Sequence, residues 1–193
     1  MNYIESDLRN YVTKVLGGLD SHDLDHTLRV VKLARRIAKE ENADSDVVVV
    51  AAYLHDIARP IERIDPKVDH AKKGAEIARK VLEKFGFPKE KMEMVAQAIE
   101  DHRFRNGKIP RTLEGKVLQD ADRLDAIGAI GIYRVIFYSC EHGRSINDTI
   151  KHFEEKILRL KNTLHTKTAK KLAKKRHELV KMFVDSLKEE LNL

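Results

Sequence analysis

The chain has 193 residues, a length that fits one domain with a single buried core and is short for two full-sized domains. Apolar residues make up 42% and charged residues 35%, a composition that excludes disordered, collagen-like and membrane-spanning chains. The net charge of +6 is concentrated in residues 151–181, which hold 11 Lys and Arg against 3 Asp and Glu. We therefore expect a globular protein whose basic part is its C-terminal third.

Three further features bear on the location of the protein. The longest apolar stretch, Val47 to Leu54, is far shorter than the roughly 20 residues that cross a bilayer. The first residues lack the basic start and apolar core of an export signal. The single cysteine, Cys140, cannot form a disulfide within one chain. These features predict a cytoplasmic protein with no membrane partner, and they leave homo-oligomerisation open.

Apolar residues recur at helical spacing along nearly the whole chain, and no alternating run is long enough to require a sheet, so we predict an all-α fold. There is no internal repeat and no low-complexity linker. The expected helices cover residues 4–16, 21–41, 45–56, 70–85 and 113–138, and a further helix that begins at Pro88 and extends to His102. Two long basic amphipathic helices are expected from Ser145 onward.

Several boundaries follow from residues that cap or interrupt helices. Asp44 or Ser45 can cap the third helix, because a side-chain oxygen at that position accepts from the first free amides. Pro60 and Pro66 are expected to bracket a loop. Gly128 lies inside the predicted helix 113–138, where a glycine indicates close packing or a break. We expect the apolar stripe of the last helix to consist of its large side chains, Leu172, Leu179, Phe183, Leu187 and Leu191.

Imidazole and carboxylate side chains interrupt otherwise apolar helix faces. His26 and Asp122 lie on such stripes, and the His55–Asp56 doublet ends the most apolar helix. Because burying an unpaired carboxylate is costly, Asp56 and Asp122 need a cation, either a Lys or Arg side chain or a metal. A divalent ion held by two imidazole nitrogens and two carboxylate oxygens meets this need. Such a ligand set suits Mn, Fe, Co, Ni or Zn better than Mg or Ca.

The order of these residues resembles that of the HD-domain metal-dependent phosphohydrolases. The resemblance rests on His26 in SHDLDHTLRV, on the doublet in AAYLHDIA and on Asp122 in DADRLDAIGAIG. It implies one HD-type helical domain over residues 1–193, with the metal site within residues 20–140 and the helices of residues 145–193 packed on it. It also implies one divalent ion, with the ligands His26, His55, Asp56 and Asp122.

Within the family, the segment LHTKTAKKLAKKRHELV looks like the tail of one prokaryotic branch of small, single-domain HD proteins, which includes nucleotide pyrophosphatases. This resemblance predicts a small phosphorylated nucleotide as substrate and the release of pyrophosphate from a nucleoside triphosphate. The chain has no GYP motif, so resemblance to the cyclic dinucleotide phosphodiesterases of the family is not supported.

Two further histidines leave the number of metal ions open. His70 and His102 lie at helix ends on apolar stripes, and the order His, His-Asp, His, His, Asp also resembles that of two-metal phosphodiesterases and oxygenases of the superfamily. We expect one tight metal site, with His70 and His102 facing the substrate as hydrogen-bond donors to phosphate oxygens or as acid–base groups. Among the neighbouring carboxylates, Asp120 and Asp125, only the family pattern selects Asp122 as the ligand, and Asp125 is a second candidate on the substrate side.

Metal coordination makes hydroxide available at neutral pH, and the same ion can contact a phosphate oxygen. The expected catalytic residues are Asp56, His70, His102 and Asp125. The basic side chains next to these motifs are expected to bind the remaining phosphates, and they are Arg59, Lys73, Arg103 and Arg123.

Two other classes of protein compete with an enzyme. A nucleic-acid-binding module would use the basic C-terminal region, although the chain has few aromatic residues for base stacking. A metal-stabilised scaffold would keep the ligands for folding alone, so that metal would raise its stability without turnover.

Overall fold

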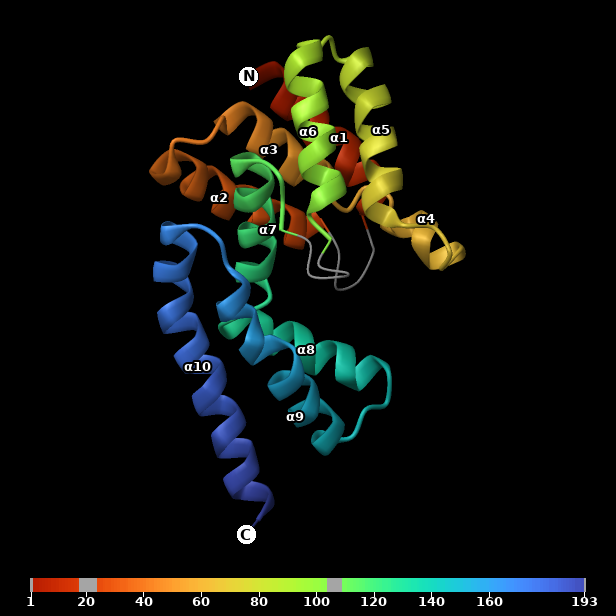
Figure 1. Ribbon diagram of the computed structural model, residues 1–193. Coiled ribbons are helices and arrows are strands. Elements are labelled where there is room, and N and C mark those ends of the chain that lie inside the picture. The colour runs from red at the N-terminus through yellow and green to blue at the C-terminus, as the bar shows by residue number, and fades with distance from the viewer. Residues whose placement is uncertain (1, 18–23, 104–108, 193) are drawn as a thin grey trace. The chain divides into compact units, whose positions relative to one another are not determined.

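The computed structural model describes residues 2–17, 24–103 and 109–192, and every regular element in these ranges is a helix (Figure 1). This confirms the predicted all-α fold. The chain divides into two compact units, Met1–Ala121 and Asp122–Leu193. The organisation as one HD-type domain stays a prediction, and the expected start of the second helix at residue 21 lies outside the described residues.

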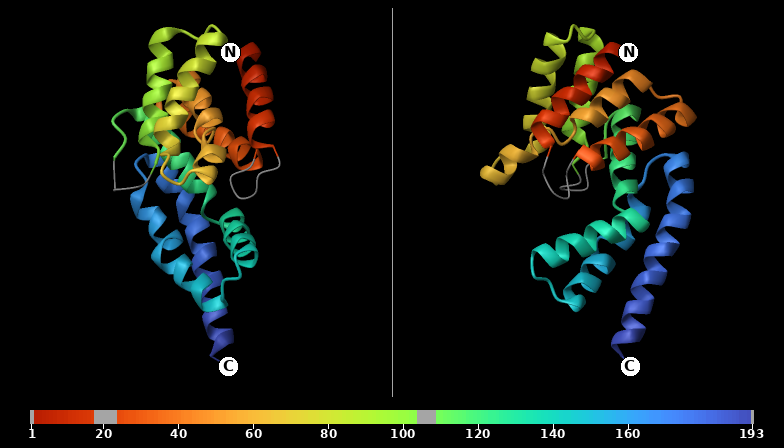
Figure 2. Two further views of the ribbon diagram at one scale, coloured as in Figure 1. Left: turned by 90° about the vertical axis from the view of Figure 1, so that its right-hand side faces the viewer. Right: turned by 180° about the vertical axis from the view of Figure 1, so that it is seen from behind.

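The first unit is built around one fully buried helix. All eight residues from Val47 to Leu54 are buried, as their apolar character predicts, and Asp44 caps this helix by accepting from the amides of Asp46 and Val47. The buried helix α3 packs against α2, α6 and α1, and α5 and α6 run side by side (Figures 1 and 2). The helices of this unit are α1 (Asn2–Leu16), α2 (Leu24–Glu41), α3 (Ser45–Leu54), α4 (Arg59–Ile64), α5 (His70–Lys84), α6 (Lys89–Asp101) and most of α7 (Leu113–Asp125).

The prediction of a loop between Pro60 and Pro66 is wrong, because α4 occupies most of this segment. Pro60 lies in the first turn of this helix, where the missing amide hydrogen has no intrahelical partner to lose. The presence of α4 matters for the site, because its first residue is Arg59.

The second unit consists of α8 (Ala129–Glu141), α9 (Ile146–Glu155), the 3₁₀ helix η1 (Ile157–Thr163) and α10 (Lys167–Leu191). The predicted helix 113–138 breaks at Gly128, whose φ of +86° suits a residue without Cβ. The first basic segment is not one long helix, since α9 ends at Glu155 and continues as η1.

The predicted apolar stripe of the last helix is only partly right, since Leu172, Phe183 and Leu187 are half-buried. Leu179 and Leu191 are exposed by 42% and 48%, while smaller residues face η1, α8 and α9. Small side chains let neighbouring backbones approach closely, which a ranking by hydrophobicity does not reveal. The buried residues of α10 are Thr168, Ala169, Ala173, His177, Val180 and Val184. Among the described residues, no helix combines the length and the apolar character that crossing a membrane would need.

Candidate metal centre

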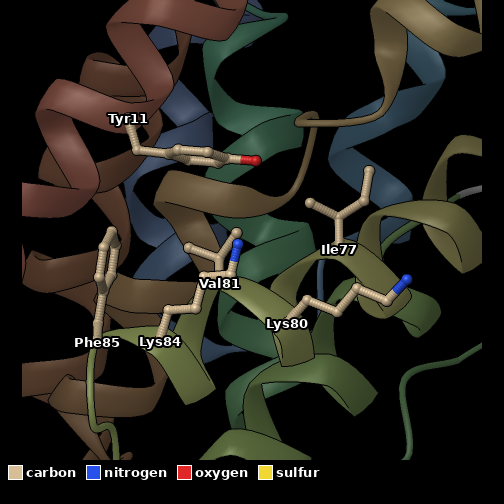
Figure 3. A pocket seen from close by; sticks show the side chains of 6 residues that line it. All are labelled: Tyr11, Ile77, Lys80, Val81, Lys84 and Phe85. Carbon is tan, nitrogen blue, oxygen red and sulfur yellow. The ribbon is translucent and has the colours of Figure 1, made fainter.

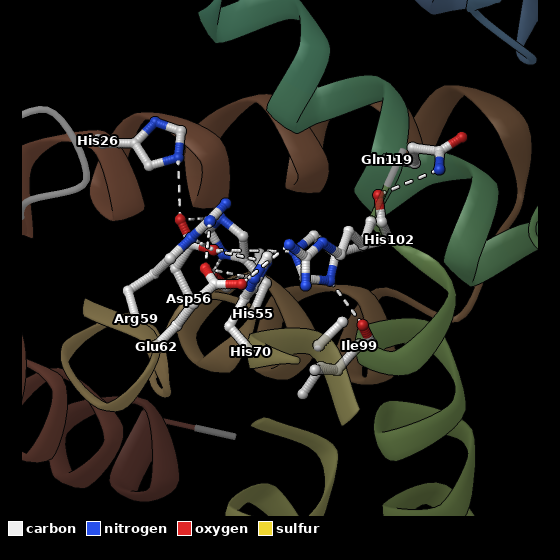
Figure 4. A network of polar contacts seen from close by, with 12 residues as sticks. His26, His55, Asp56, Arg59, Glu62, His70, Ile99, His102 and Gln119 are labelled. Carbon is white, nitrogen blue, oxygen red and sulfur yellow. Dashed lines mark hydrogen bonds and ion pairs between the residues drawn. The ribbon is translucent and has the colours of Figure 1, made fainter. Parts of the chain in front are cut away.

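Asp56 lies in a buried cluster of polar side chains in the first unit, with only 2% of its surface exposed (Figure 4). Two imidazoles face one oxygen of its carboxylate. His26 extends from the first turn of α2 and places Nε2 3.9 Å from Oδ2, and His55 follows the last turn of α3 and places Nε2 3.6 Å from the same oxygen. Both imidazoles are fully buried.

Two more imidazoles face the other oxygen. His70 is the first residue of α5 and His102 follows the last residue of α6, and both Nε2 atoms lie 3.7 Å from Oδ1 of Asp56. Gly74, one turn after His70, allows this approach. A Cβ there would lie 3.3 Å from Ile99 Cγ2 and 3.6 Å from the carbonyl oxygen of His55.

Backbone carbonyls orient two of these rings. His55 Nδ1 lies 2.8 Å from the carbonyl oxygen of Ala52, and His102 Nδ1 lies 2.5 Å from that of Ile99. Because a carbonyl oxygen can only accept, each Nδ1 carries the proton, and each Nε2 presents a lone pair. Gln119 fixes the backbone at His102, because its amide donates to the carbonyl oxygens of Asp101 and His102.

This arrangement fits a metal ion better than a hydrogen-bonded core. The four Nε2 atoms lie 3.6–3.9 Å from the carboxylate oxygens, which is too far for hydrogen bonds. Two ligands that each lie about 2.1 Å from one ion are at most about 4.2 Å apart. The ligand atoms form two groups, each within 4.8 Å, namely His26–His55–Asp56 and Asp56–His70–His102. Lone pairs that face a carboxylate repel it unless a cation lies between them, and imidazole with carboxylate suits a divalent transition metal.

Burial, with a smaller contribution from the positive charge of Arg59, lowers the pKa of His70 to about 4. The imidazole of His70 is therefore neutral at neutral pH, the state in which it can bind a metal or accept a proton. Its Nε2 is buried and makes no hydrogen bond within the described part of the chain.

Two arginines lie beside the cluster and share one carboxylate. Arg59 donates from Nε to Oδ1 of Asp56 and from Nη1 to Oε2 of Glu62, both at 2.9 Å. Arg103 lies 2.9 Å from Glu62 and 3.2 Å from Asp69, which caps α5. Burial alone would raise the pKa of Glu62, but His70 and the two arginines outweigh it and lower the pKa.

Sequence reasoning named both arginines and missed the carboxylate that joins them. Glu62 also lies 2.9 Å from Nδ1 of His70. The available signal was the spacing of three residues between Arg59 and Glu62, which places them on one face if the segment is helical. The expectation of a loop there concealed it.

The remaining predicted site residues have other surroundings. Lys73 in α5 is 42% exposed and pairs with Glu76 at 2.7 Å. In the second unit, Asp122 is half-buried on α7, Asp125 accepts from Arg134 at 2.8 Å, and buried Arg123 donates to the carbonyl oxygen of Thr163. The roles of Asp122, Asp125, Lys73 and Arg123 in binding stay predictions.

A cavity of ≈ 430 Å³ lies elsewhere in the first unit, between α1 and α5 (Figure 3). Apolar side chains form most of its wall, with two lysines at the edge, and it includes none of the predicted site residues. Its lining residues are Tyr11, Ile77, Lys80, Val81, Lys84 and Phe85.

Comparisons with known proteins agree on one family. Residues 23–127 match the model of the HD domain. The chain is 37% identical over 194 residues to YpgQ of Bacillus subtilis (strain 168), an uncharacterized protein, with 95% of this chain and 92% of YpgQ aligned.

Solved structures show the same similarity. The crystal structure of Bacillus subtilis YpgQ in complex with ADP matches with a TM-score of 0.79 at 34% identity, covering 96% of this chain and 97% of that chain. A predicted HD superfamily hydrolase from an uncultured Thermotogales bacterium matches with a TM-score of 0.75 at 37% identity, covering 96% and 92%.

Proposed function

The chain belongs to the HD-domain family of metal-dependent phosphohydrolases, and from this premise we propose that it releases pyrophosphate from a nucleoside triphosphate. The observation that carries the proposal is the buried Asp56 carboxylate with imidazole nitrogens facing both of its oxygens. The relative YpgQ was crystallised with ADP, which supports a nucleotide as the substrate.

We assign one divalent ion, Mn, Co, Ni, Fe or Zn, to His26, His55, Asp56 and Asp122. When bound, such an ion supplies an activated water at neutral pH and polarises a phosphate oxygen. His26 and His55 would hold the ion through Nε2, and the hydrogen bond from His55 Nδ1 to the carbonyl oxygen of Ala52 orients that ring. Asp56 balances the charge of the ion, and Asp122 is the proposed fourth ligand.

The other side of the site positions the substrate. His70 and His102 face the reacting phosphate, and the protonated Nδ1 of His102 leaves its Nε2 able to accept a proton. Arg59 and Arg103, exposed by 25% and 18%, bring positive charge to the polyphosphate chain. Lys73, Arg123 and Asp125 are proposed to support binding or catalysis less directly.

One observation favours a second candidate, a two-metal enzyme. His70 and His102 face Oδ1 of Asp56 as closely as His26 and His55 face Oδ2, so each carboxylate oxygen has a pair of imidazoles that could hold an ion with it. Such a protein would act as a phosphodiesterase or an oxygenase of the superfamily. Counting the bound ions separates this candidate from the proposed one-ion enzyme.

A third candidate is suggested by the exposed basic face of α10, where five lysines lie within about two turns: Lys167, Lys170, Lys171, Lys174 and Lys175. The affinity for nucleic acid bound there would fall steeply as salt is added and would not change with a chelator. Such a module gives no reason for the buried imidazoles around Asp56. A cytoplasmic location and self-association stay proposals as well.

The test is a nucleotide panel with the metal-free protein reloaded with Mn, Co, Ni or Mg, in which phosphate and pyrophosphate are measured separately. We expect pyrophosphate from at least one triphosphate, loss of the activity with a chelator, and its return with the metal. Metal that raises thermal stability while neither product appears would instead identify a scaffold.

A further inference from the structure

The two sides of Asp56 carry equal sets of imidazole ligands, so ligand geometry alone does not explain a single ion. The side of Oδ2 has nitrogens at 3.6 and 3.9 Å, and the side of Oδ1 has both at 3.7 Å. Each set keeps its ligand atoms within 4.8 Å of one another. Asp122 is the proposed fourth ligand of the ion that His26 and His55 bind, and the surroundings of Oδ1 supply a second distinguishing feature.

That feature is a guanidinium. Arg59 donates from Nε to Oδ1 at 2.9 Å, so positive charge already lies on the oxygen that His70 and His102 face. A divalent ion bound to Oδ1 would stand within a few ångströms of this charge. Repulsion between like charges is strong at that distance, because a site that is mostly buried screens it less than water does.

Glu62 keeps the guanidinium in this place. Its Oε2 accepts from Nη1 of Arg59 at 2.9 Å, three residues along the short helix α4, while Oε1 lies 2.9 Å from Arg103. Arg59 is thus held by Asp56 on one side and by Glu62 on the other. Releasing it toward solvent would break two charge-assisted hydrogen bonds.

We propose that Arg59 takes the place of a second metal ion on Oδ1 of Asp56, so that His70 and His102 form a latent metal site which the arginine keeps empty of metal. The proposal rests on the one-ion site of the proposed function. It gives Arg59 a role in fixing the number of ions, beyond any contact with substrate phosphate.

Removal of the charge should open the second site. In Arg59→Gln, the side chain keeps a polar end of smaller size and loses the cation, so His70, His102 and Asp56 Oδ1 can bind a second ion. Arg59→Lys restores a cation at the same position and should return the protein to one ion. Arg63→Gln makes the same change of charge at an exposed position of α4 and is the matched control.

The experiment is equilibrium dialysis of the full chain against Mn²⁺, with bound metal measured by elemental analysis and the spin coupling between ions by electron paramagnetic resonance. We expect one ion in the wild type, Arg59→Lys and Arg63→Gln. Arg59→Gln should bind a second ion at least about tenfold more tightly than the wild type does, with the spectrum of a coupled pair. The double variant Arg59→Gln/His102→Ala should return to one uncoupled ion.

Two outcomes would overturn the proposal: a wild type that already binds two ions, or an Arg59→Gln variant that binds one. If circular dichroism shows that Arg59→Gln does not fold, Arg59→Met, which is also uncharged, takes its place and should likewise bind two ions. The dialysis uses no nucleotide, so its result does not depend on whether the proposed hydrolysis occurs. If every variant binds one ion and the separate nucleotide assay shows pyrophosphate release, only the role of Arg59 is rejected.

Discussion

The two sides of the Asp56 carboxylate differ in charge while their ligands are nearly the same. Oδ2 faces His26 and His55, whereas Oδ1 faces two imidazoles and also accepts from the guanidinium of Arg59. A metal site is therefore defined by its ligands and also by the cations that compete for the same oxygen. Substitutions that affect one side and spare the other test this distinction.

The largest effect should follow from losing the residue that both sides share. Asp56→Ala should bind no metal and show no turnover, because it removes the negative charge that balances the ion. Elemental analysis and the pyrophosphate assay measure both losses, and circular dichroism should still show a helical protein. Asp65→Ala, at an exposed position after α4, is the control, and unchanged metal content in Asp56→Ala would refute the site.

Single histidine replacements should separate the two sides. His26→Ala and His55→Ala should lose the ion, since they remove its ligands. His70→Ala and His102→Ala should keep it and lower kcat by about 10²- to 10⁴-fold, the usual contribution of a positioned acid–base group. Loss of one equivalent of metal from His70→Ala or His102→Ala, starting from two, would show that both sides bind an ion.

Metal should also stabilise the folded chain through the Oδ2 side. At a free concentration a hundred times its Kd, an ion that binds only the folded state adds about 2.7 kcal/mol to the free energy of unfolding. Thermal unfolding with and without Mn²⁺ measures this, and the increase should survive in His102→Ala and vanish in His26→Ala. An equal increase in both variants would mean that the ion binds elsewhere.

The smallest predicted effect lies outside the site, at the start of α3, the helix that directly precedes His55. Burial opposes the charge of Asp44, but Lys91 and the amides of Asp46 and Val47 outweigh it and lower the pKa. Asp44→Ala should therefore cost about 1 kcal/mol at neutral pH. The cost should be complete above the ordinary pKa of a carboxyl group and should shrink as the pH falls below it, because the unfolded carboxylate is protonated first. A cost that is independent of pH down to acid unfolding would argue against the cap.

The sequence predicted the parts of this molecule that depend on apolar patterning. The buried helix α3 is an example, since eight consecutive apolar residues leave no face for solvent. Its position explains why His55 and Asp56, which directly follow, are buried too. His70 and His102 were also found from their places on apolar stripes, although patterning did not show that both face one oxygen of Asp56.

What patterning missed was polar pairing and close packing. Glu62 was overlooked because two prolines suggested a loop, whereas a proline in the first turn is compatible with a helix. In α10 the alanines pack inward and Leu179 stays exposed, because small side chains allow closer contact. The distance from Arg59 to Asp56 depends on how a short helix leaves the end of α3, which no local pattern specifies.

The most direct test of the account is a titration of the metal-free protein with Mn²⁺ while pyrophosphate release from a nucleoside triphosphate is followed. We predict that turnover rises in proportion to added metal and reaches its plateau at one ion per chain. Turnover that stays near zero through the first equivalent and rises only with the second would contradict the assignment of a single catalytic ion to His26, His55, Asp56 and Asp122.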